Sequence, residues 1–288
     1  MRLPLTLTGP GEEMPTAQGS EMLRDDNQLI HDKITVPTQK PRTSRPRLLD
    51  VLTDNLTNYT ATIVNGRAGT GKTTLSAEFA RRATRPVCWY KVDAADADLD
   101  VFCRYLTSTL RSQRTTLDCD RLMEITESVE SDRAEVLAEA FVFQLAELEE
   151  PLLVIIEDLH LIYDADWVVP FFHRLLPLLP ADIHLIITCR SLPPAPLWRL
   201  RSKQMLRVIE ETELAFTLEE TTRLFETYGL SEEHARIALR ETNGRAAAIA
   251  NFAATPGRAG RAVADSFLAL EPRPATSSMG QISSELPT

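Results

Sequence analysis

The sequence has no apolar run long enough to cross a bilayer. A membrane-spanning helix needs about 20 consecutive apolar residues, and no run in these 288 residues approaches that length. The N-terminal segment MRLPLTLTGP is too weakly basic, and too short in its apolar part, to be a secretory signal peptide. These absences disfavour membrane insertion and secretion, and they predict a cytoplasmic protein.

Positive charge is also scarce. Lysine and arginine number 31 against 41 aspartate and glutamate residues, which gives a formal net charge of −10. A surface that binds nucleic acid neutralises phosphates with an excess of basic side chains. The balance therefore argues against nucleic acid as a direct partner of this chain, although it leaves room for local basic patches.

Residues that carry metal, redox or nucleophilic chemistry form no recognisable pattern. The four cysteines, Cys88, Cys103, Cys119 and Cys189, show no Cys-x-x-Cys spacing, and all but Cys119 lie within apolar patterns. The histidines form no metal-spaced cluster, and no Gly-x-Ser-x-Gly nucleophile motif is present. We therefore expect unpaired, mostly buried thiols in a reducing compartment.

What the sequence does contain is a glycine-rich loop of the phosphate-binding type. It matches the pattern Gly, any four residues, Gly, Lys, then Ser or Thr. Its residues are Gly66, Arg67, Ala68, Gly69, Thr70, Gly71, Lys72, Thr73 and Thr74. The glycines let the backbone curl so that N–H groups point at phosphate oxygens. Lys72 supplies a charge for the β- and γ-phosphates, and the Thr73 hydroxyl can ligate Mg²⁺.

The surroundings of this loop favour a nucleotide site over an ordinary glycine-rich turn. A short β-branched run, 61–64, ends just before Gly66, and Leu75 and Phe79 begin an apolar stripe at helical spacing after Lys72. Strand, glycine loop and helix is the order that phosphate binding requires, because the helix offers its positive N-terminal end to the anion.

Strands and helices alternate through most of the chain. We predict strands at 61–65, 87–92, 152–157, 183–188 and 205–209. Strands separated by helices predict an α/β fold of the P-loop NTPase class, with a parallel sheet covered by helices on both faces. In such sheets, ligands bind at the carboxyl ends of the strands.

The pattern changes to helices alone after Ala215. Thr217 and Glu220 have the spacing of a capping box at the start of a helix. The predicted organisation is a disordered leader at 1–34, a nucleotide-binding α/β domain at 35–215, a small helical lid at 216–254, and a disordered tail at 255–288.

Two carboxylates end the apolar run that starts at Leu152. Glu157 and Asp158 would face the phosphate loop, one binding Mg²⁺ and the other orienting or deprotonating a water molecule. Neighbouring side chains on a strand point to opposite faces. Either only one of the two acids therefore faces the nucleotide, or the strand ends between them and both turn in. Arg190, after the next strand, could bond the γ-phosphate or pair with a nearby acid. His160 is expected to have a structural role.

Together these elements resemble the nucleotide-binding, NB-ARC-like module of the MalT-type LuxR-family transcriptional regulators, which belong to the STAND class of signalling ATPases. The resemblance runs from about Val36 to Ala254. Its motifs are Val36–Pro37, Arg45–Leu49, the glycine loop, Val87–Asp93, Glu157–Ile162, Thr188–Arg190, Leu214–Glu220 and Thr242–Ala247.

The resemblance implies ATP or ADP with Mg²⁺ as cofactors. It assigns phosphate and Mg²⁺ to Lys72 and Thr73, and the roles of Walker B acids to Glu157 and Asp158. Arg190 would be the sensor arginine, and the segment that begins with Arg45 and Pro46 would lie against the adenine. Such modules rest closed with ADP, open and self-assemble with ATP and an inducer, and hydrolyse ATP slowly.

This sequence departs from that family in two ways. The first Walker B position is usually Asp and here is Glu157. The winged helix, sensor array and DNA-binding helix-turn-helix of the family are not recognised in this sequence. We therefore expect a switch module that lacks those domains and binds an adenine nucleotide, with self-association or a partner regulatory protein. The alternatives are a catalytic P-loop ATPase or kinase, and a non-hydrolysing ATP-binding module.

Overall fold

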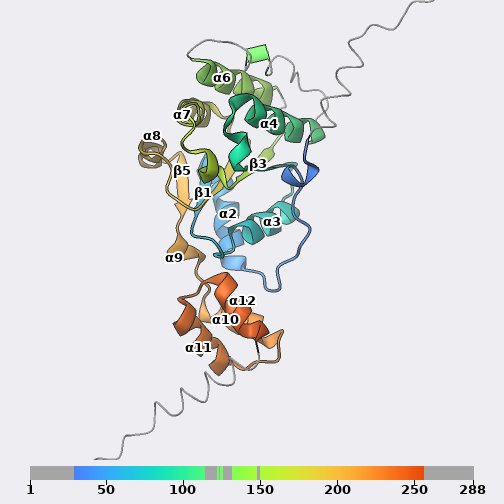
Figure 1. Cartoon of the computed structure of the whole chain (residues 1–288), viewed down its shortest axis with the longest axis vertical. Helices are drawn as coiled ribbons and strands as arrows, with labels where there is room; N and C mark the ends of the chain where they lie inside the picture. Colours follow the sequence, from blue (N-terminus) through green and yellow to red (C-terminus); the bar gives the residue numbers. More distant parts are fainter. Residues whose placement is uncertain (1–28, 114–121, 123, 126–131, 148–149, 256–288) are drawn as a thin grey trace, which may run out of the picture.

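Five parallel strands form one sheet in the order β2-β3-β4-β1-β5 (Figure 1). The computed structural model describes residues 29–113, 122, 124–125, 132–147 and 150–255. The strands are β1 (Ala61–Asn65), β2 (Val87–Lys91), β3 (Leu152–Glu157), β4 (Ile183–Cys189) and β5 (Leu206–Ile209). The predicted α/β class with a parallel sheet is confirmed, and the carboxyl ends of all five strands meet at one edge.

Helices cover both faces of the sheet, which is why residues on both sides of its central strand β3 are apolar. Alternate residues of β3 enter different cores: Val154 packs with α4 (Leu99–Gln113), α6 (Arg133–Ala146) and α7 (Val168–Leu178), whereas Ile155 packs with α2 (Pro46–Asn58) and α3 (Lys72–Arg82). All residues of β3 and β4 are buried. The arrangement places α3, with the glycine loop before it, over the end of the sheet.

Three short helices form a separate bundle below the sheet in the view of Figure 1. They are α10 (Leu218–Glu226), α11 (Glu232–Thr242) and α12 (Ala246–Ala254). Their core includes Phe225 and Phe252, whose ring centroids are 6.1 Å apart. The capping box is confirmed, because the Glu220 N–H donates to the Thr217 hydroxyl over 3.2 Å and the Thr217 N–H donates to the Glu220 carboxylate over 3.0 Å.

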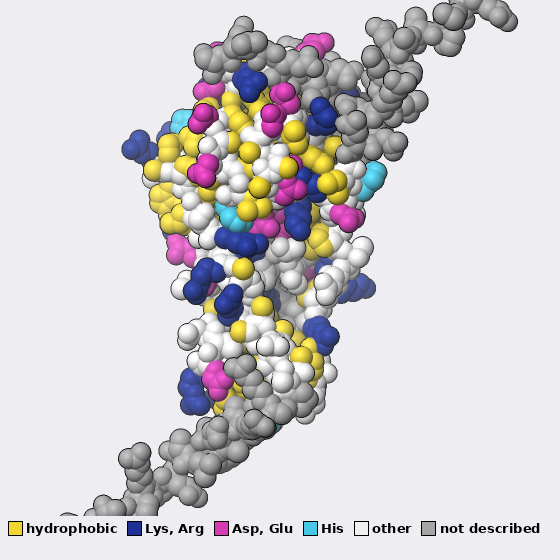
Figure 2. All heavy atoms as spheres, viewed as in Figure 1, with side chains coloured by type: hydrophobic (Ala, Val, Ile, Leu, Met, Phe, Trp, Pro, Cys, Tyr) yellow, Lys and Arg dark blue, Asp and Glu magenta, His cyan; other side chains and the backbone are white. Residues whose placement is uncertain are grey.

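A short helix, α9 (Glu211–Leu214), joins β5 to the bundle. The other short elements are η2 (His31–Lys33), η3 (Ala94–Ala97), η4 (Leu159–Ile162), α8 (Ala195–Trp198) and η5 (Arg199–Lys203). Figure 2 shows several Lys and Arg side chains on the narrow part of the molecule between the sheet and the bundle. Within the described part of the chain, no helix combines the length and apolar character needed to cross a membrane.

The expected disordered leader at 1–34 is wrong for its last residues. Residues 29–34 contain η2, and Lys33 is only 7% exposed. The Lys33 ammonium donates to both carboxylate oxygens of Asp96 over 2.5 and 2.6 Å and lies 3.1 Å from Asp93. It also lies 4.1 Å from the ring centroid of Tyr105. A buried charge held by two distant carboxylates leaves no periodic signal in the sequence.

Several predictions concern residues that the structure does not describe. The described residues do not include 1–28 of the expected leader, the expected tail from 256 onward, or Cys119. Cys88, Cys103 and Cys189 are buried, as the apolar patterns around them predicted, and none of these three forms a disulfide bond.

His184 bridges β4 to the start of β1 within the sheet. Its Nδ1–H donates to the Tyr59 carbonyl over 2.9 Å, so its Nε2 accepts from the Thr62 hydroxyl at 3.0 Å. Burial lowers the pKa of His184 to about 4. The neutral imidazole therefore belongs to the folded state, and protonation favours unfolding.

The His184 contribution to stability is expected to be complete above pH 6.5 and lost as the pH falls towards 4. The shift from the ordinary pKa of 6.5 corresponds to about 3 kcal/mol. Urea unfolding of the wild type and His184→Gln at pH 7.5 and pH 5 measures this contribution, because glutamine does not titrate. The variant should lose less stability between the two pH values, and equal losses would contradict the assignment.

Candidate nucleotide-binding site

The glycine loop between β1 and α3 adopts a backbone that only glycine accommodates. Gly69 has φ +80° and Gly71 has φ +87°. A Cβ atom added at Gly69 would lie 2.9 Å from the Ala247 Cβ, and one added at Gly71 would lie 3.0 Å from the Arg45 guanidinium. The loop is therefore tightly packed against two other parts of the chain, and its glycines are needed for space as well as for conformation.

Lys72 folds back over this loop. Its ammonium donates to the Gly66 carbonyl over 2.6 Å and to the Arg67 carbonyl over 3.1 Å. Burial lowers the pKa of Lys72, while Asp158 favours the charged form and Arg190 opposes it. The ammonium is thus partly stripped of water beside the loop, where a bound anion would favour its charged form.

Glu157, the last residue of β3, is fully buried without a hydrogen-bond donor. Neither carboxylate oxygen accepts a hydrogen bond from the described residues. Burial raises the pKa of Glu157 to about 7, and the neighbouring Thr73 hydroxyl opposes that rise. A hydroxyl beside an unpartnered carboxylate is a donor set that suits Mg²⁺, which binds one or two protein oxygens together with phosphates and water. The residues present therefore fit a magnesium nucleotide.

Asp158 lies in a different environment from Glu157. Its φ of +56° places it in the left-handed region, and β3 ends just before it. Its N–H donates to the Thr188 hydroxyl over 3.0 Å, and its carboxylate lies 3.7 Å from the Arg190 Nε and 3.8 Å from the His160 Nδ1. The strand thus ends between the two acids. Arg190 is half exposed and faces Asp158.

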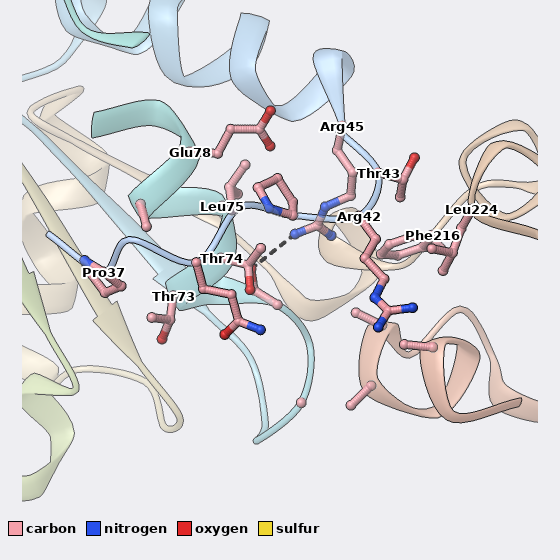
Figure 3. Close-up of a pocket in the computed structure, with 18 residues that line it drawn as sticks. Pro37, Arg42, Thr43, Arg45, Thr73, Thr74, Leu75, Glu78, Phe216 and Leu224 are labelled. Carbon is pink, nitrogen blue, oxygen red and sulfur yellow. Dashed lines mark hydrogen bonds between the residues drawn. The ribbon is translucent and has the colours of Figure 1, made fainter. Parts of the chain in front are cut away.

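A cavity of about 380 Å³ lies beside the loop, between the sheet and the bundle (Figure 3). Three segments line it. They are the extended segment 37–45, the loop with the first turns of α3 (Gly69 to Glu78), and the bundle residues Phe216, Leu224, Ala246, Ala247 and Ala250. In Figure 3, Phe216 and Leu224 lie at one side of the cavity and Thr73 and Pro37 at the other. An apolar wall therefore stands opposite the hydroxyl and the glycine loop.

Arg45 is the part of the predicted adenine segment that reaches this cavity. Its guanidinium is buried and donates to the Leu214 carbonyl over 2.9 Å and the Gly71 carbonyl over 3.1 Å. Burial lowers the pKa of Arg45 to about 10. Pro46 begins α2 and is not among the lining residues, and Leu48 is buried in the core. The bundle residues of the wall were missed by sequence reasoning, because three of them are alanines without a chemical signature.

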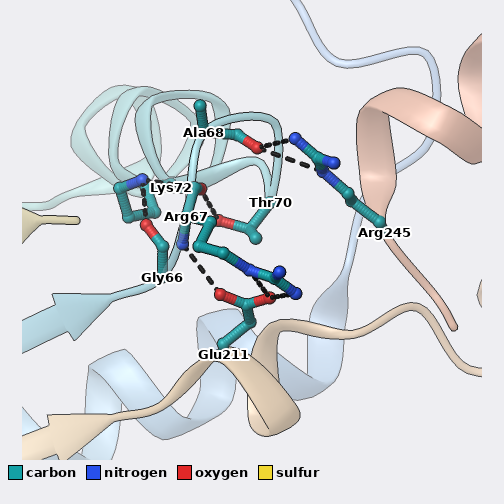
Figure 4. Close-up of polar contacts among 7 residues, drawn as sticks. All are labelled: Gly66, Arg67, Ala68, Thr70, Lys72, Glu211 and Arg245. Carbon is teal, nitrogen blue, oxygen red and sulfur yellow. Dashed lines mark hydrogen bonds and ion pairs between the residues drawn. The ribbon is translucent and has the colours of Figure 1, made fainter. Parts of the chain in front are cut away.

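The bundle touches the loop directly. The Arg245 guanidinium donates to the Ala68 carbonyl over 3.1 Å from Nε and 2.6 Å from Nη2 (Figure 4). The Ala247 N–H donates to the Gly69 carbonyl over 2.9 Å. Arg67 points away from the cavity, and its guanidinium pairs with Glu211 of α9 over 2.7 Å. Ala68 and Gly69 of the loop thus contact the bundle, whereas Arg67 contacts α9.

A parallel sheet with this loop between β1 and its helix defines a P-loop NTPase. More specifically, the chain belongs to the AAA ATPase domain family, whose model matches residues 43–187, half of the chain.

Curated relatives are bacterial transcriptional regulators. The chain is 31% identical over 182 residues to the HTH-type transcriptional regulator MalT of Vibrio cholerae serotype O1, which covers 63% of this chain and 20% of that protein. It is 30% identical over 199 residues to the MalT of Yersinia enterocolitica, which covers 69% of this chain and 22% of that protein. The chain spans about a fifth of the length of these relatives, and it is a P-loop ATPase domain related to them.

Solved structures give a weaker comparison. A Walker-type ATPase of Pyrococcus abyssi aligns with a TM-score of 0.49 and 13% identity, covering 81% of this chain and 77% of that one. The Aeropyrum pernix Orc1 protein in complex with DNA aligns with a TM-score of 0.46 and 14% identity, covering 80% and 66%. The sheet order and the match to the AAA ATPase domain family define the fold of this chain.

Replacing Glu157 by glutamine is expected to stabilise the nucleotide-free protein at high pH. A pKa of about 7 lies above the ordinary 4.5, so the contribution of this group is complete below pH 4.5 and lost as the pH rises through 7. Glutamine imitates the protonated carboxyl, so the variant should exceed the wild type by up to about 3 kcal/mol at pH 8. Urea unfolding without nucleotide or magnesium, at pH 8 and pH 4.5, should show this advantage only at pH 8.

Proposed function

We propose that this chain is an adenine-nucleotide-binding switch module of a signalling or transcriptional regulator, with slow ATP hydrolysis. One observation carries the proposal: α12 contacts the glycine loop through Ala247 on Gly69 and Arg245 on Ala68. The same loop supplies the amides that would hold phosphates. A change in the bound phosphates therefore alters the surface on which the bundle rests.

The cavity supports a nucleotide as the ligand. Its volume of about 380 Å³ falls within the range of small-molecule sites. Phe216 and Leu224 offer an apolar wall for a base, while Gly69, Gly71 and Thr73 adjoin the place for an anionic tail. Because the bundle contributes one wall, binding a nucleotide would hold the bundle against the sheet.

The residues at the carboxyl edge suit the roles that the sequence proposed for them. Lys72 would bind the β- and γ-phosphates, and Thr73 with Glu157 would hold Mg²⁺, which when bound neutralises phosphate charge. Asp158 would orient or deprotonate the attacking water. Arg190, whose Nε is 3.7 Å from Asp158, would respond to the γ-phosphate. The relationship to the MalT regulators supports this assignment.

Slow turnover is proposed because of the state of Glu157. A carboxyl group with a pKa of about 7 is partly protonated at neutral pH, so Glu157 has to release its proton before it can hold Mg²⁺. Its side chain is also one methylene longer than the Asp usual at this position. Phosphate release below about one turnover per second, under the typical enzyme range, would agree with a switch.

The output of the switch belongs to this proposal as well. The regulators to which the chain is related are about five times as long as the matched region. We propose that the nucleotide-dependent position of the bundle acts through self-association or through a partner regulatory protein, with no direct contact between this chain and nucleic acid.

Lys72→Ala is expected to weaken Mg-ADP binding at least about 100-fold, because charge-assisted bonds to two phosphates are lost. Isothermal titration calorimetry of the full chain measures the dissociation constant. Lys203→Ala removes an exposed lysine of η5 and serves as the matched control, with unchanged affinity. Equal affinities in the wild type and Lys72→Ala would contradict the nucleotide site.

Asp158→Asn is expected to slow phosphate release from ATP at least about tenfold while Mg-ADP affinity is kept, because the amide cannot accept a proton from water. A phosphate-release assay with saturating Mg-ATP measures the rate. Unchanged release would refute the role of Asp158. Tight binding without any turnover in the wild type would instead favour a non-hydrolysing module, and rapid transfer to a small acceptor would favour a kinase.

A further inference from the structure

A second cavity, of about 510 Å³, also adjoins the glycine loop. It is a crevice between the loop, α9 and the turn that joins α11 to α12. Its lining includes Arg67, Thr70, Glu211, Thr242, Asn243 and Arg245. It shares no lining residue with the nucleotide cavity, so the two spaces are separate.

The charged groups of this crevice leave one positive charge uncompensated. Glu211 is fully engaged by Arg67: its Oε1 accepts from the guanidinium over 2.9 and 2.7 Å, and its Oε2 accepts from the Arg67 backbone N–H over 2.8 Å. In the part of the chain that the structure describes, Arg245 forms no direct salt bridge. Its charge acts on Glu211 only from a distance, and its guanidinium donates twice to the neutral Ala68 carbonyl. The crevice is therefore electropositive at Arg245.

The remaining polar groups suit a small hydroxylated anion. The hydroxyls of Thr70 and Thr242 donate to the Arg67 and Ala238 carbonyls, which leaves their oxygens able to accept hydrogen bonds. Asn243, exposed at the turn with φ +50°, adds an amide. A guanidinium with hydroxyl and amide neighbours matches a phosphate ester of a polyhydroxylated molecule, because the arginine fork binds two phosphate oxygens at once.

We propose that this crevice is a second ligand site, which binds a small phosphate-bearing molecule through Arg245. The site is spatially separate from the nucleotide cavity. Its occupation affects the bundle, because a guanidinium forms a bidentate pair of opposite charges with a phosphate, whereas the Ala68 carbonyl offers it a single neutral oxygen. The ligand therefore draws Arg245 away from Ala68. Of the described hydrogen bonds between the start of α12 and the loop, the one from Ala247 to Gly69 then remains. Only this second step rests on the proposed switch function.

Inorganic phosphate is the probe for the site, titrated by calorimetry into the full-length Lys72→Ala variant, in which the nucleotide site is disabled. We expect saturable binding that weakens at least about tenfold when Arg245→Gln is added, the loss of one charge-assisted contact. Arg245→Lys keeps the charge and should retain most of the affinity. Arg190→Gln, a change at the nucleotide site, is the matched control and should leave phosphate binding unchanged.

Three results would overturn the site: no phosphate binding in Lys72→Ala, equal affinity with and without Arg245→Gln, or a loss caused by Arg190→Gln alone. If Arg245→Gln fails to fold, Arg67→Gln tests the same crevice, and it should change the phosphate affinity because it frees Glu211 beside Arg245.

The coupling between the crevice and the nucleotide site is measured separately as the rate of ADP release. Phosphate should accelerate ADP release from the wild type but not from Arg245→Gln. Failure of the wild type to bind ADP would refute the switch and leave the phosphate result standing.

Discussion

The close approach of two distant segments to the glycine loop constrains the rest of the molecule. Arg45, from the start of α2, and Ala247, from α12, each lie where a side chain on Gly71 or Gly69 would have to be. A change in the loop backbone at Gly69 or Gly71 therefore requires one of these two neighbours to move. Because Ala247 belongs to the bundle, the local backbone of the loop and the position of the bundle form one mechanical unit.

Arginine side chains reinforce this unit at the connection between the sheet and the bundle. Arg47 donates to the Glu213 carbonyl over 2.9 Å and the Ala215 carbonyl over 3.2 Å, and Arg45 holds the Leu214 carbonyl between them. Three successive carbonyls of the connection are therefore bound by guanidinium groups from α2. Hydrogen bonds from charged donors are stronger than neutral ones, so these bonds fix the backbone of the connection between the sheet and the bundle.

Two buried charged groups show how differently the chain treats structure and function. Lys33 is buried with two carboxylates and an aromatic ring around its ammonium, which offsets the cost of removing it from water. Glu157 is buried with neither oxygen bonded by a described residue, and the neighbouring Thr73 hydroxyl offsets only part of the cost of burial, because the pKa stays raised to about 7. An unpaired buried carboxyl group beside a hydroxyl and a phosphate-binding loop is the mark of a site built for a ligand.

The sequence by itself determined the glycine loop, the five strands and the capping box at Thr217, because each depends on residues close together in the chain. Local spacing fixes backbone conformation, and an uninterrupted apolar run such as β3 requires burial on both faces. Only the tertiary structure decided that Lys33 is buried, that Glu157 and Asp158 lie in different environments, and that Ala247 and Arg245 rest on the loop. Contacts between segments about 180 residues apart depend on how helices pack, and an alanine or a lone arginine carries no pattern that announces its partner.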